Sequence, residues 1–136
     1  MREILFRGKR TDNGEWIFGY YEYVPVMDLH RIIYNYREIG DTTIESDWAS
    51  VIPSTVGQYT GLTDKNGKKI FEGDIIDTPD RLVKVVWFAG NAQFDLHFIR
   101  YIDDITIINF KGIHMRDLKE YEVIGNIHDN PELLEG

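Results

Sequence analysis

Cysteine is absent from this chain of 136 residues. Disulfide bonds, thiol nucleophiles and every metal site that needs a cysteine ligand are therefore excluded. The four histidines (His30, His97, His114 and His128) never occur at the H-x-x-x-H or H-x-H spacing of a metal-binding pair. We therefore expect neither a metal site nor a cofactor.

Long apolar runs are also missing. No uncharged apolar stretch approaches the roughly 20 residues that a membrane-spanning helix needs. The opening residues MREILFRGKR carry charges where the apolar core of a signal peptide would lie. We therefore expect a protein without a membrane segment that stays in the cytoplasm.

Positive charge is scarce, because 15 Lys and Arg stand against 23 Asp and Glu, for a formal net charge of −8. Proteins that neutralise nucleic-acid phosphates commonly show a basic excess or a basic face. Two small basic groups could still meet on one surface, and they consist of Arg7, Lys9, Arg10, Lys65, Lys68 and Lys69. Charge therefore disfavours nucleic-acid binding but leaves it open as the alternative function.

The alternation of apolar and polar residues predicts β-strands. Residues 3–24 predict a hairpin in which Asn13 and Gly14 can supply the positive φ angles of a tight turn. Residues 81–102 predict a second hairpin with its turn near residues 90–91. Further strands are expected within residues 30–38, 49–62, 68–77, 104–113 and 119–127.

Helical signals are weak. The polar residues 39–48 predict a solvated loop, with a helical turn that starts at Thr43 or Ser46 as the second choice. A short helix within residues 112–121 and a helical turn opened by Pro131 complete the set.

About eight short strands separated by Gly, Asn, Asp and Pro indicate a mainly β protein. We expect a single domain over residues 1–136, in which an N-terminal β-hairpin lobe (about 1–53) packs on a C-terminal part (about 54–136). The C-terminal part is expected to form a small antiparallel β-barrel of the SH3-like kind. A bulge or bend is expected at Gly73.

Residues 57–76, GQYTGLTDKNGKKIFEGDII, are rich in glycine and charge. A phosphate-binding loop is excluded because five residues, where the motif requires four, separate Gly61 from Gly67, and Lys69 replaces the magnesium-binding Ser or Thr. A calcium loop is excluded because Lys68 occupies a ligand position.

A hairpin loop explains the same stretch without any ligand. Asp64 can accept hydrogen bonds from nearby backbone N–H groups. Asn66 and Gly67 can adopt left-handed backbone conformations. We therefore expect this loop to be a structural element.

Glu72 and Asp74 lie two residues apart, so a regular strand would place both carboxylates on one face, as in glycosidases. A bend at Gly73 opposes this arrangement, and acids beside a bend commonly bind loop amides. We expect no catalytic site here.

The residues of this stretch that we expect to have a structural role are called the structural signature. They are Tyr59, Asp64, Asn66, Gly67, Glu72, Gly73 and Asp74.

Tyrosines provide the remaining functional signal. Tyr20, Tyr21, Tyr23, Tyr34 and Tyr36 lie in predicted strands whose two faces cannot both be core in so small a domain. An exposed Tyr-rich face could bind a protein partner, stack nucleobases or form a subunit interface. Ordinary half-burial on a sheet is the competing explanation.

Several strings resemble the YopX family, namely FRGKRTDNGEWIFGYY, VIPSTVGQYTGLTDKNGKKIFEGDII, VKVVWFAGNAQFDL and YEVIGNIHDNPELL. They leave residues 25–50 and about 100–119 as variable parts. The resemblance implies a mainly β protein of unknown function from a phage, a prophage or a gut bacterium, acting in the bacterial cytoplasm. It implies no catalytic residue and no cofactor.

Together these features favour a phage-derived, non-enzymatic β-barrel module that binds a protein partner or associates with itself as a homo-oligomer. The alternative is a small barrel that binds nucleic acid. A hydrolase that uses Glu72 and Asp74 is the third hypothesis.

Overall fold

The computed structural model describes residues 3–79, 81–88, 93–101 and 115–135. These residues are mainly β structure with a few short 3₁₀ segments, as the sequence predicts. The chain divides into two compact units, Met1–Tyr59 and Thr60–Gly136. Among the described residues, no helix has the length and apolar character needed to cross a membrane.

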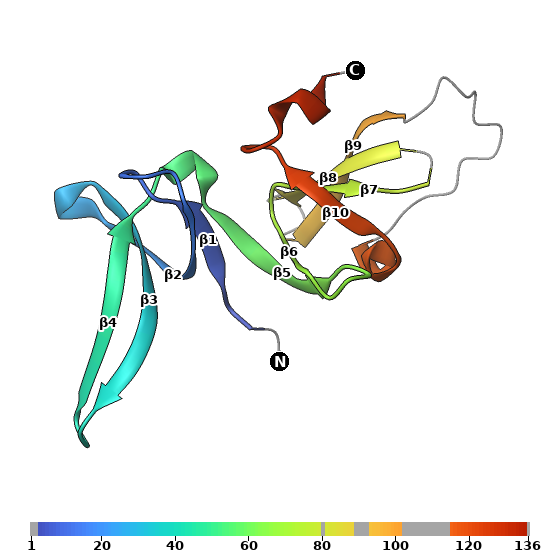
Figure 1. Cartoon of the computed structure of the whole chain (residues 1–136). Coiled ribbons are helices and arrows are strands. Elements are labelled where there is room, and N and C mark those ends of the chain that lie inside the picture. The colour runs from blue at the N-terminus through green and yellow to red at the C-terminus, as the bar shows by residue number, and fades with distance from the viewer. Residues whose placement is uncertain (1–2, 80, 89–92, 102–114, 136) are drawn as a thin grey trace. The chain divides into compact units, whose positions relative to one another are not determined.

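The first unit is an antiparallel sheet with the strand order β4-β3-β2-β1-β5. Its elements are β1 (Phe6–Lys9), β2 (Trp16–Val24), η1 (Pro25–Met27), β3 (Leu29–Ile39), β4 (Thr43–Ser50), η2 (Pro53–Thr55) and the start of β5 (Gly57–Thr63). Figure 1 shows β3 and β4 as one long hairpin. The core of this unit is small and centres on Ile32, Ala49 and Val51.

The first predicted hairpin is confirmed by the β1–β2 ladder, but its turn differs from the expected one. Gly14 has a φ of 72°, whereas Asn13 is not among the residues with positive φ. The loop is instead closed where the backbone N–H of Arg10 donates to the carbonyl of Glu15 over 2.9 Å. The connection is therefore longer than a two-residue turn.

The polar stretch after β3 is a strand, so the prediction of a solvated loop over residues 39–48 is wrong. β4 pairs with β3, and only residues 40–42 form the turn. Apolar alternation is not required here because charged cross-strand neighbours hold the exposed hairpin together. The guanidinium of Arg37 lies 3.3 Å from the carboxylate of Glu45 and 3.4 Å from that of Asp47.

The second unit contains an open antiparallel sheet with the order β10-β7-β8-β9, and the end of β5 beside β6. Its further elements are β6 (Lys69–Phe71), β7 (Asp74–Asp77), β8 (Arg81–Phe88), β9 (Gln93–Tyr101), η3 (Met115–Glu120), β10 (Glu122–Asn126) and η4 (Pro131–Leu134). The buried cluster consists of Ile70, Ile76, Val83, Val85, Phe94, Leu118 and Val123.

The closed SH3-like barrel expected for this part is not confirmed. In the part of the chain that the structure describes, β9 and β10 are the two edges of the four-stranded sheet and do not pair with each other. The β8–β9 ladder confirms the second hairpin. Its turn at residues 90–91 and the strand predicted over 104–113 lie outside the described residues.

Gly73 does more than bend one strand, because the chain changes sheets there. β6 ends at Phe71 and β7 begins at Asp74, with Gly73 between them at a φ of 93°. The backbone N–H of Gly73 donates to the carbonyl of Val85, and its own carbonyl accepts from the N–H of Ile127. The Asp74 carboxylate closes the turn by accepting the N–H of Phe71 over 2.8 Å.

Asp64 fastens the loop before β6 to a strand near the end of the chain. Its buried carboxylate accepts the backbone N–H groups of Asn66 (2.8 Å), Lys68 (2.9 Å) and Val123 (3.0 Å). Only Gly67 has a positive φ in this loop, at 81°, so the left-handed conformation expected for Asn66 is absent. The predicted acceptance of loop amides is confirmed, and the bond to β10 adds a contact that the sequence did not indicate.

The environment of Asp64 sets its charge. Burial by itself would raise the pKa of this carboxyl group, but hydrogen bonds from the amides of Val123, Lys68 and Asn66 outweigh burial, and the charge of Lys68 adds to them. The pKa of Asp64 therefore lies below its ordinary value. The carboxylate form stabilises the fold, because each amide hydrogen bond is charge-assisted.

We expect Gly19→Ala to destabilise the first unit. A Cβ at this position would lie 2.1 Å from the carbonyl oxygen of Ile33, so the β2–β3 ladder must shift. Overpacking of this kind costs about 1–3 kcal/mol of the free energy of unfolding, measurable by urea titration. Gly8→Ala is the milder control, because its nearest neighbours are side-chain atoms at 3.1–3.2 Å. Equal stability of the two variants would contradict the close approach of Gly19 to the backbone of Ile33 as the reason for a glycine here.

Replacement of Asp64 by Asn should lower the free energy of unfolding by about 2 kcal/mol at pH 7, because the amide loses a charge and one acceptor oxygen. The folded pKa is depressed, so the stabilisation is present above the unfolded pKa near ~4 and is lost as pH falls through the folded value. Urea titrations between pH 7 and pH 2 should show the gap between wild type and Asp64→Asn closing. Asp41→Asn, at an exposed site in the turn between β3 and β4, is the control. A gap that is constant with pH would refute the charge assignment.

Candidate functional site

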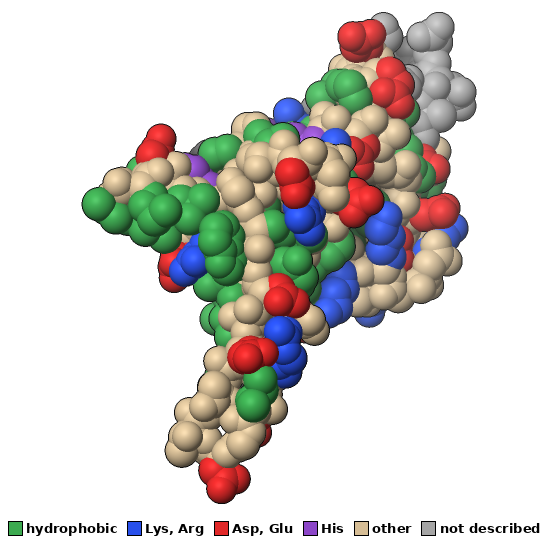
Figure 2. All heavy atoms as spheres, turned by 60° about the vertical axis from the view of Figure 1, so that its left-hand side comes forward, with side chains coloured by type: hydrophobic (Ala, Val, Ile, Leu, Met, Phe, Trp, Pro, Cys, Tyr) green, Lys and Arg blue, Asp and Glu red, His purple; other side chains and the backbone are tan. Residues whose placement is uncertain are grey.

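Exposed apolar side chains concentrate in the first unit. Among the described residues, those of the first unit are Ile4, Phe18, Tyr20, Tyr23, Val26, Met27, Tyr36, Ile39, Ile44, Trp48 and Ile52. The second unit contributes Trp87, Ile124 and Leu134. Figure 2 shows hydrophobic side chains gathered on this face of the molecule, and in η1 Val26 is 90% and Met27 68% exposed. Exposed apolar side chains that gather on one part of a surface commonly mark an interaction site.

One face of the first sheet carries a row of large side chains across three strands. Tyr20 on β2 lies opposite Ile33 on β3, and Ile33 lies opposite Trp48 on β4. Residues directly opposite each other share a face in an antiparallel sheet. By alternation along β2, Phe18 and Trp16 lie on the same face as Tyr20. Tyr20 is 52% exposed, Trp48 50% and Phe18 48%, so this row faces outward.

A β-bulge adds Tyr36 to the same face. Tyr34 pairs with Asp47 but the next pair is Arg37 with Glu45, so β3 contains one extra residue there. Asn35 lies in the bulge with a φ of 56°. The bulge reverses the alternation, and the ring of Tyr36 meets that of Tyr20 edge-on at 5.4 Å.

We call Trp16, Phe18, Tyr20, Ile33, Tyr36 and Trp48 the aromatic face. A hollow of about 360 Å³ is lined by Tyr20 and Tyr36. Cross-strand pairing and ring contacts hold these side chains in place. The aromatic face is therefore ordered by the fold itself, which would lower the entropy cost of any binding.

Cations stack on two rings of the aromatic face. The guanidinium carbon of Arg7 lies 4.7 Å from the ring centre of Trp16, and that of Arg31 lies 5.1 Å from the ring centre of Trp48. Arg7 is only 6% exposed. Arg31 also pairs with Glu22 at 2.6 Å. These cations are engaged within the protein, so they act chiefly as supports for the rings.

The other three predicted tyrosines lie on the opposite side of the sheet. Tyr21 hydrogen-bonds to His30, and burial raises the pKa of its hydroxyl. The ring of Tyr23 stacks on His30 at 4.4 Å. Its hydroxyl donates to Asp28, and this bond raises the pKa of Tyr23. Tyr34 is half-buried and lies on that side by alternation along β3. The structure therefore divides the five tyrosines between two faces.

The basic residues considered for nucleic-acid binding fall in both units. Arg7 is buried, as described above. Arg10 lies 2.8 Å from Asp12, and Lys65 lies 3.7 Å from Glu122. These engaged cations weaken the case for a phosphate-binding surface, because neutralisation of phosphates needs cations that can leave their own partners.

The acids of the predicted structural signature lie in the turns of the second unit. Asp74 is 1% exposed and binds the amide of Phe71, so it faces the backbone and not a cleft. Glu72 is in the turn between β6 and β7. Tyr59 is buried, and its N–H donates to the carbonyl of Leu5 over 2.8 Å. This geometry opposes the glycosidase-like pairing of Glu72 with Asp74.

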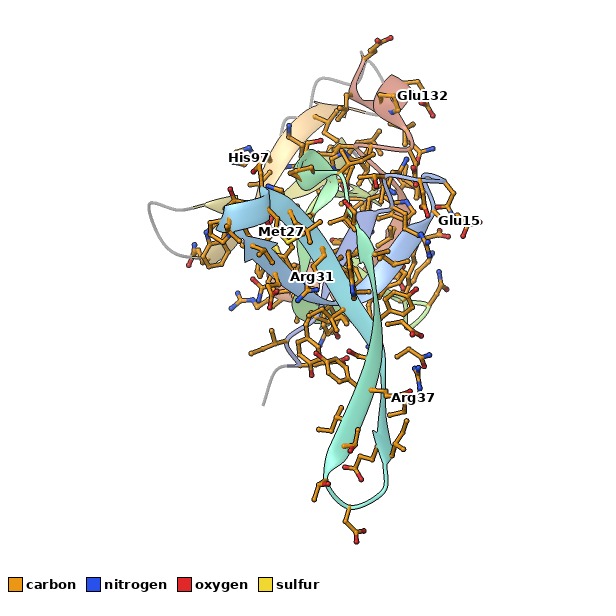
Figure 3. The ribbon with its side chains drawn as sticks, turned by 90° about the vertical axis from the view of Figure 1, so that its left-hand side faces the viewer. Glu15, Met27, Arg31, Arg37, His97 and Glu132 are labelled. Carbon is orange, nitrogen blue, oxygen red and sulfur yellow. The ribbon has the colours of Figure 1, made fainter. Side chains whose placement is uncertain are left out.

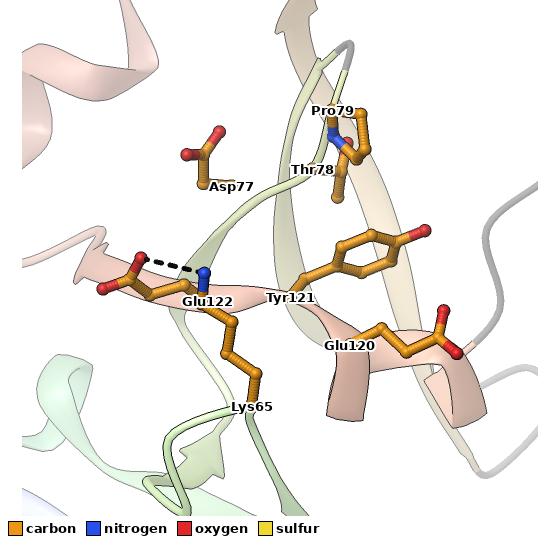
Figure 4. A pocket seen from close by; sticks show the side chains of 7 residues that line it. All are labelled: Lys65, Asp77, Thr78, Pro79, Glu120, Tyr121 and Glu122. Carbon is orange, nitrogen blue, oxygen red and sulfur yellow. Dashed lines mark ion pairs between the residues drawn. The ribbon is translucent and has the colours of Figure 1, made fainter.

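A second hollow, of about 350 Å³, lies in the second unit. It is lined by Lys65, Asp77, Thr78, Pro79, Glu120, Tyr121 and Glu122 (Figure 4). Asp77 and Glu122 are directly opposite each other in the β7–β10 ladder. In the ranges that the structure describes, no three His, Asp or Glu side chains form a group that could hold a metal ion.

Sequence reasoning missed Trp48 and Ile44 of the first unit, because residues 39–48 were expected to form a loop. The usable signal was the spacing of Ile44, Ser46 and Trp48, which a strand places on one face. It also missed Phe18 and Trp16, although their alternation with Gly19 was visible. Which side chains become neighbours on one face of a sheet depends on the register between strands, and the composition of the strands does not determine that register.

Comparisons with known proteins give a family model and a similar solved structure. No curated protein matches the chain. A crystal structure of protein EF1440 from Enterococcus faecalis is similar over 99% of this chain and 100% of its own length, with a TM-score of 0.66 and 26% sequence identity. The model of the YopX protein family matches residues 5–135. The chain therefore belongs to the YopX family.

Proposed function

We propose that this protein is a non-enzymatic, phage- or prophage-derived accessory protein that binds a protein partner in the bacterial cytoplasm through its aromatic face. The single observation that carries the proposal is the row of Tyr20, Ile33 and Trp48, which lies outward across three paired strands. Tyr and Trp dominate the binding energy of protein interfaces, because each buries a large area at a small entropy cost.

A protein partner fits this surface better than a polyanion does. Of the cations on the aromatic face, Arg7 is buried, Arg31 already pairs with Glu22, and Lys9 lies over the ring of Trp16 at 5.5 Å. The whole chain carries a net charge of −8, which repels a nucleic acid at long range. Apolar side chains of a partner could enter the hollow between Tyr20 and Tyr36 without competing with these ion pairs.

The experiment has two steps. Affinity capture from host and phage-infected lysates, followed by mass spectrometry, supplies a candidate partner for purification. Titration calorimetry of the purified pair then compares wild type with Trp48→Ala and Tyr20→Ala. Each variant should weaken the dissociation constant at least about tenfold, as expected for a central aromatic of an interface.

Trp87→Ala is the matched control, because Trp87 is a tryptophan of similar exposure (44%) in the second unit. It should leave the dissociation constant unchanged. Circular dichroism must show that all three variants keep the β fold. Unchanged affinity in both Trp48→Ala and Tyr20→Ala would remove the aromatic face from the interface and with it this proposal.

A further inference from the structure

β4 is an open edge of the first sheet. The strand order ends at β4, and no other strand in the described residues pairs with its outer side. Its eight residues, Thr43–Ser50, are long for an unprotected edge. The carbonyl of Ser50 is already used, because it accepts the N–H of Thr11 over 3.0 Å. The free part of the edge therefore runs from Thr43 to the residue before Ser50.

Alternation fixes which backbone groups of β4 face outward. The Ser50 carbonyl points away from β3 toward Thr11, whereas the N–H of the next residue, Val51, donates to His30 of β3. In a regular antiparallel ladder the outward positions recur every second residue. The N–H and C=O groups of Ser46 and Trp48 therefore point outward, where another strand could pair with them.

The two faces of β4 differ in chemistry at this edge. Ile44 and Trp48 lie on the side of the aromatic face, and both are exposed. Glu45 and Asp47 lie on the reverse side, and both form ion pairs with Arg37, which Figure 3 labels on this hairpin. Hydrogen bonds from Asn35 and Arg37 keep the pKa of Asp47 below its ordinary value, so it is charged at neutral pH. The edge therefore presents apolar groups on one side and excess negative charge on the other.

Pairing of β4 with the β4 of a second copy is opposed by these charges. Consider two copies whose β4 strands pair antiparallel, with their aromatic faces on the same side. When the pairing is centred on the strand, Glu45 of one copy lies opposite Asp47 of the other, or one of these acids lies opposite the same acid of the other copy. Like charges directly opposite each other destabilise a ladder. A strand that carries cations opposite Glu45 and Asp47 would instead form favourable cross-strand pairs.

We propose that the partner adds an extended segment to the outer edge of β4, with apolar residues on the side of the aromatic face alternating with lysine or arginine on the reverse side. This inference rests on the proposed function and names the partner's chemistry. Backbone hydrogen bonds to Ser46 and Trp48 provide affinity, and the alternating side chains provide specificity. The apolar residues extend the row of Tyr20, Ile33 and Trp48 by one strand.

Three synthetic nine-residue peptides test this chemistry on the full-length protein by fluorescence anisotropy. The first alternates valine with lysine, the second replaces each lysine by glutamate, and the third is the lysine peptide with alternate backbone nitrogens methylated. The lysine peptide should bind at least tenfold more tightly than the glutamate peptide. Methylation should abolish binding, because it removes the ladder donors while it retains every side chain.

Two variants locate the binding at β4. Ser46→Pro removes an outward N–H, which an edge strand tolerates, and it should abolish peptide binding while urea titration shows a folded protein. The variant Arg37→Glu/Glu45→Lys/Asp47→Lys retains opposite charges within the hairpin but reverses the sign of the edge. It should prefer the glutamate peptide.

The outcomes separate this inference from the proposed function. If Trp48→Ala weakens the captured partner but Ser46→Pro does not, the aromatic face binds without strand addition and the inference is wrong. The inference is also wrong if lysine and glutamate peptides bind equally, or if a single-stranded oligonucleotide binds and the lysine peptide does not. If the lysine peptide binds and Ser46→Pro abolishes its binding, while neither Trp48→Ala nor Tyr20→Ala changes peptide or partner affinity, the edge inference stands and the proposed role of the aromatic face fails.

Discussion

The carboxylate of Asp64 is the interaction on which the second unit depends. It joins the β5–β6 loop to β10 across 59 positions of sequence, through the amide of Val123. Three N–H donors converge on this one side chain, and the N–H of Lys65 adds a backbone bond to the carbonyl of Tyr121 beside them. Asp74 performs the corresponding task at the next turn, for Phe71. These two acids thus satisfy buried amides, which would be costly to leave without an acceptor.

The two units use apolar residues in different ways. In the second unit they form a buried cluster between strands that Asp64 and Asp74 hold in register. In the first unit the buried set is small, and large side chains such as Tyr20 and Trp48 lie outside. Stacking of Arg31 on Trp48 and the edge contact of Tyr36 with Tyr20 cover only part of these rings. The remaining exposed area is a cost to solubility that a binding function would explain.

The sequence predicts what local chemistry determines and fails where geometry depends on distant residues. Hairpins, the interruption at Gly73 and the loop role of Asp64 follow from turn residues and alternation. The bond from Val123 to Asp64 could not be predicted, because no local pattern relates the two positions. β4 was missed because it is held by its ladder with β3, and a polar strand of this kind has no strong apolar alternation of its own. The aromatic face was missed in part because the bulge at Asn35 moves Tyr36 to the side of Tyr20, and alternation alone would place Tyr36 beside Tyr34.

The strings by which the chain resembles the YopX family lie largely in the elements that Asp64, Gly73 and Asp74 hold together, and they exclude residues 25–50. Most of the proposed binding edge, including Tyr36, Ile44 and Trp48, lies within that excluded segment. A β3–β4 hairpin held by cross-strand pairs of its own can change its outward side chains without disturbing the turns of the second unit. The strings thus include Trp16, Phe18 and Tyr20 of the aromatic face but not its β3–β4 part. Under the proposed function, the β3–β4 hairpin is therefore the part of the binding surface that can vary with the partner.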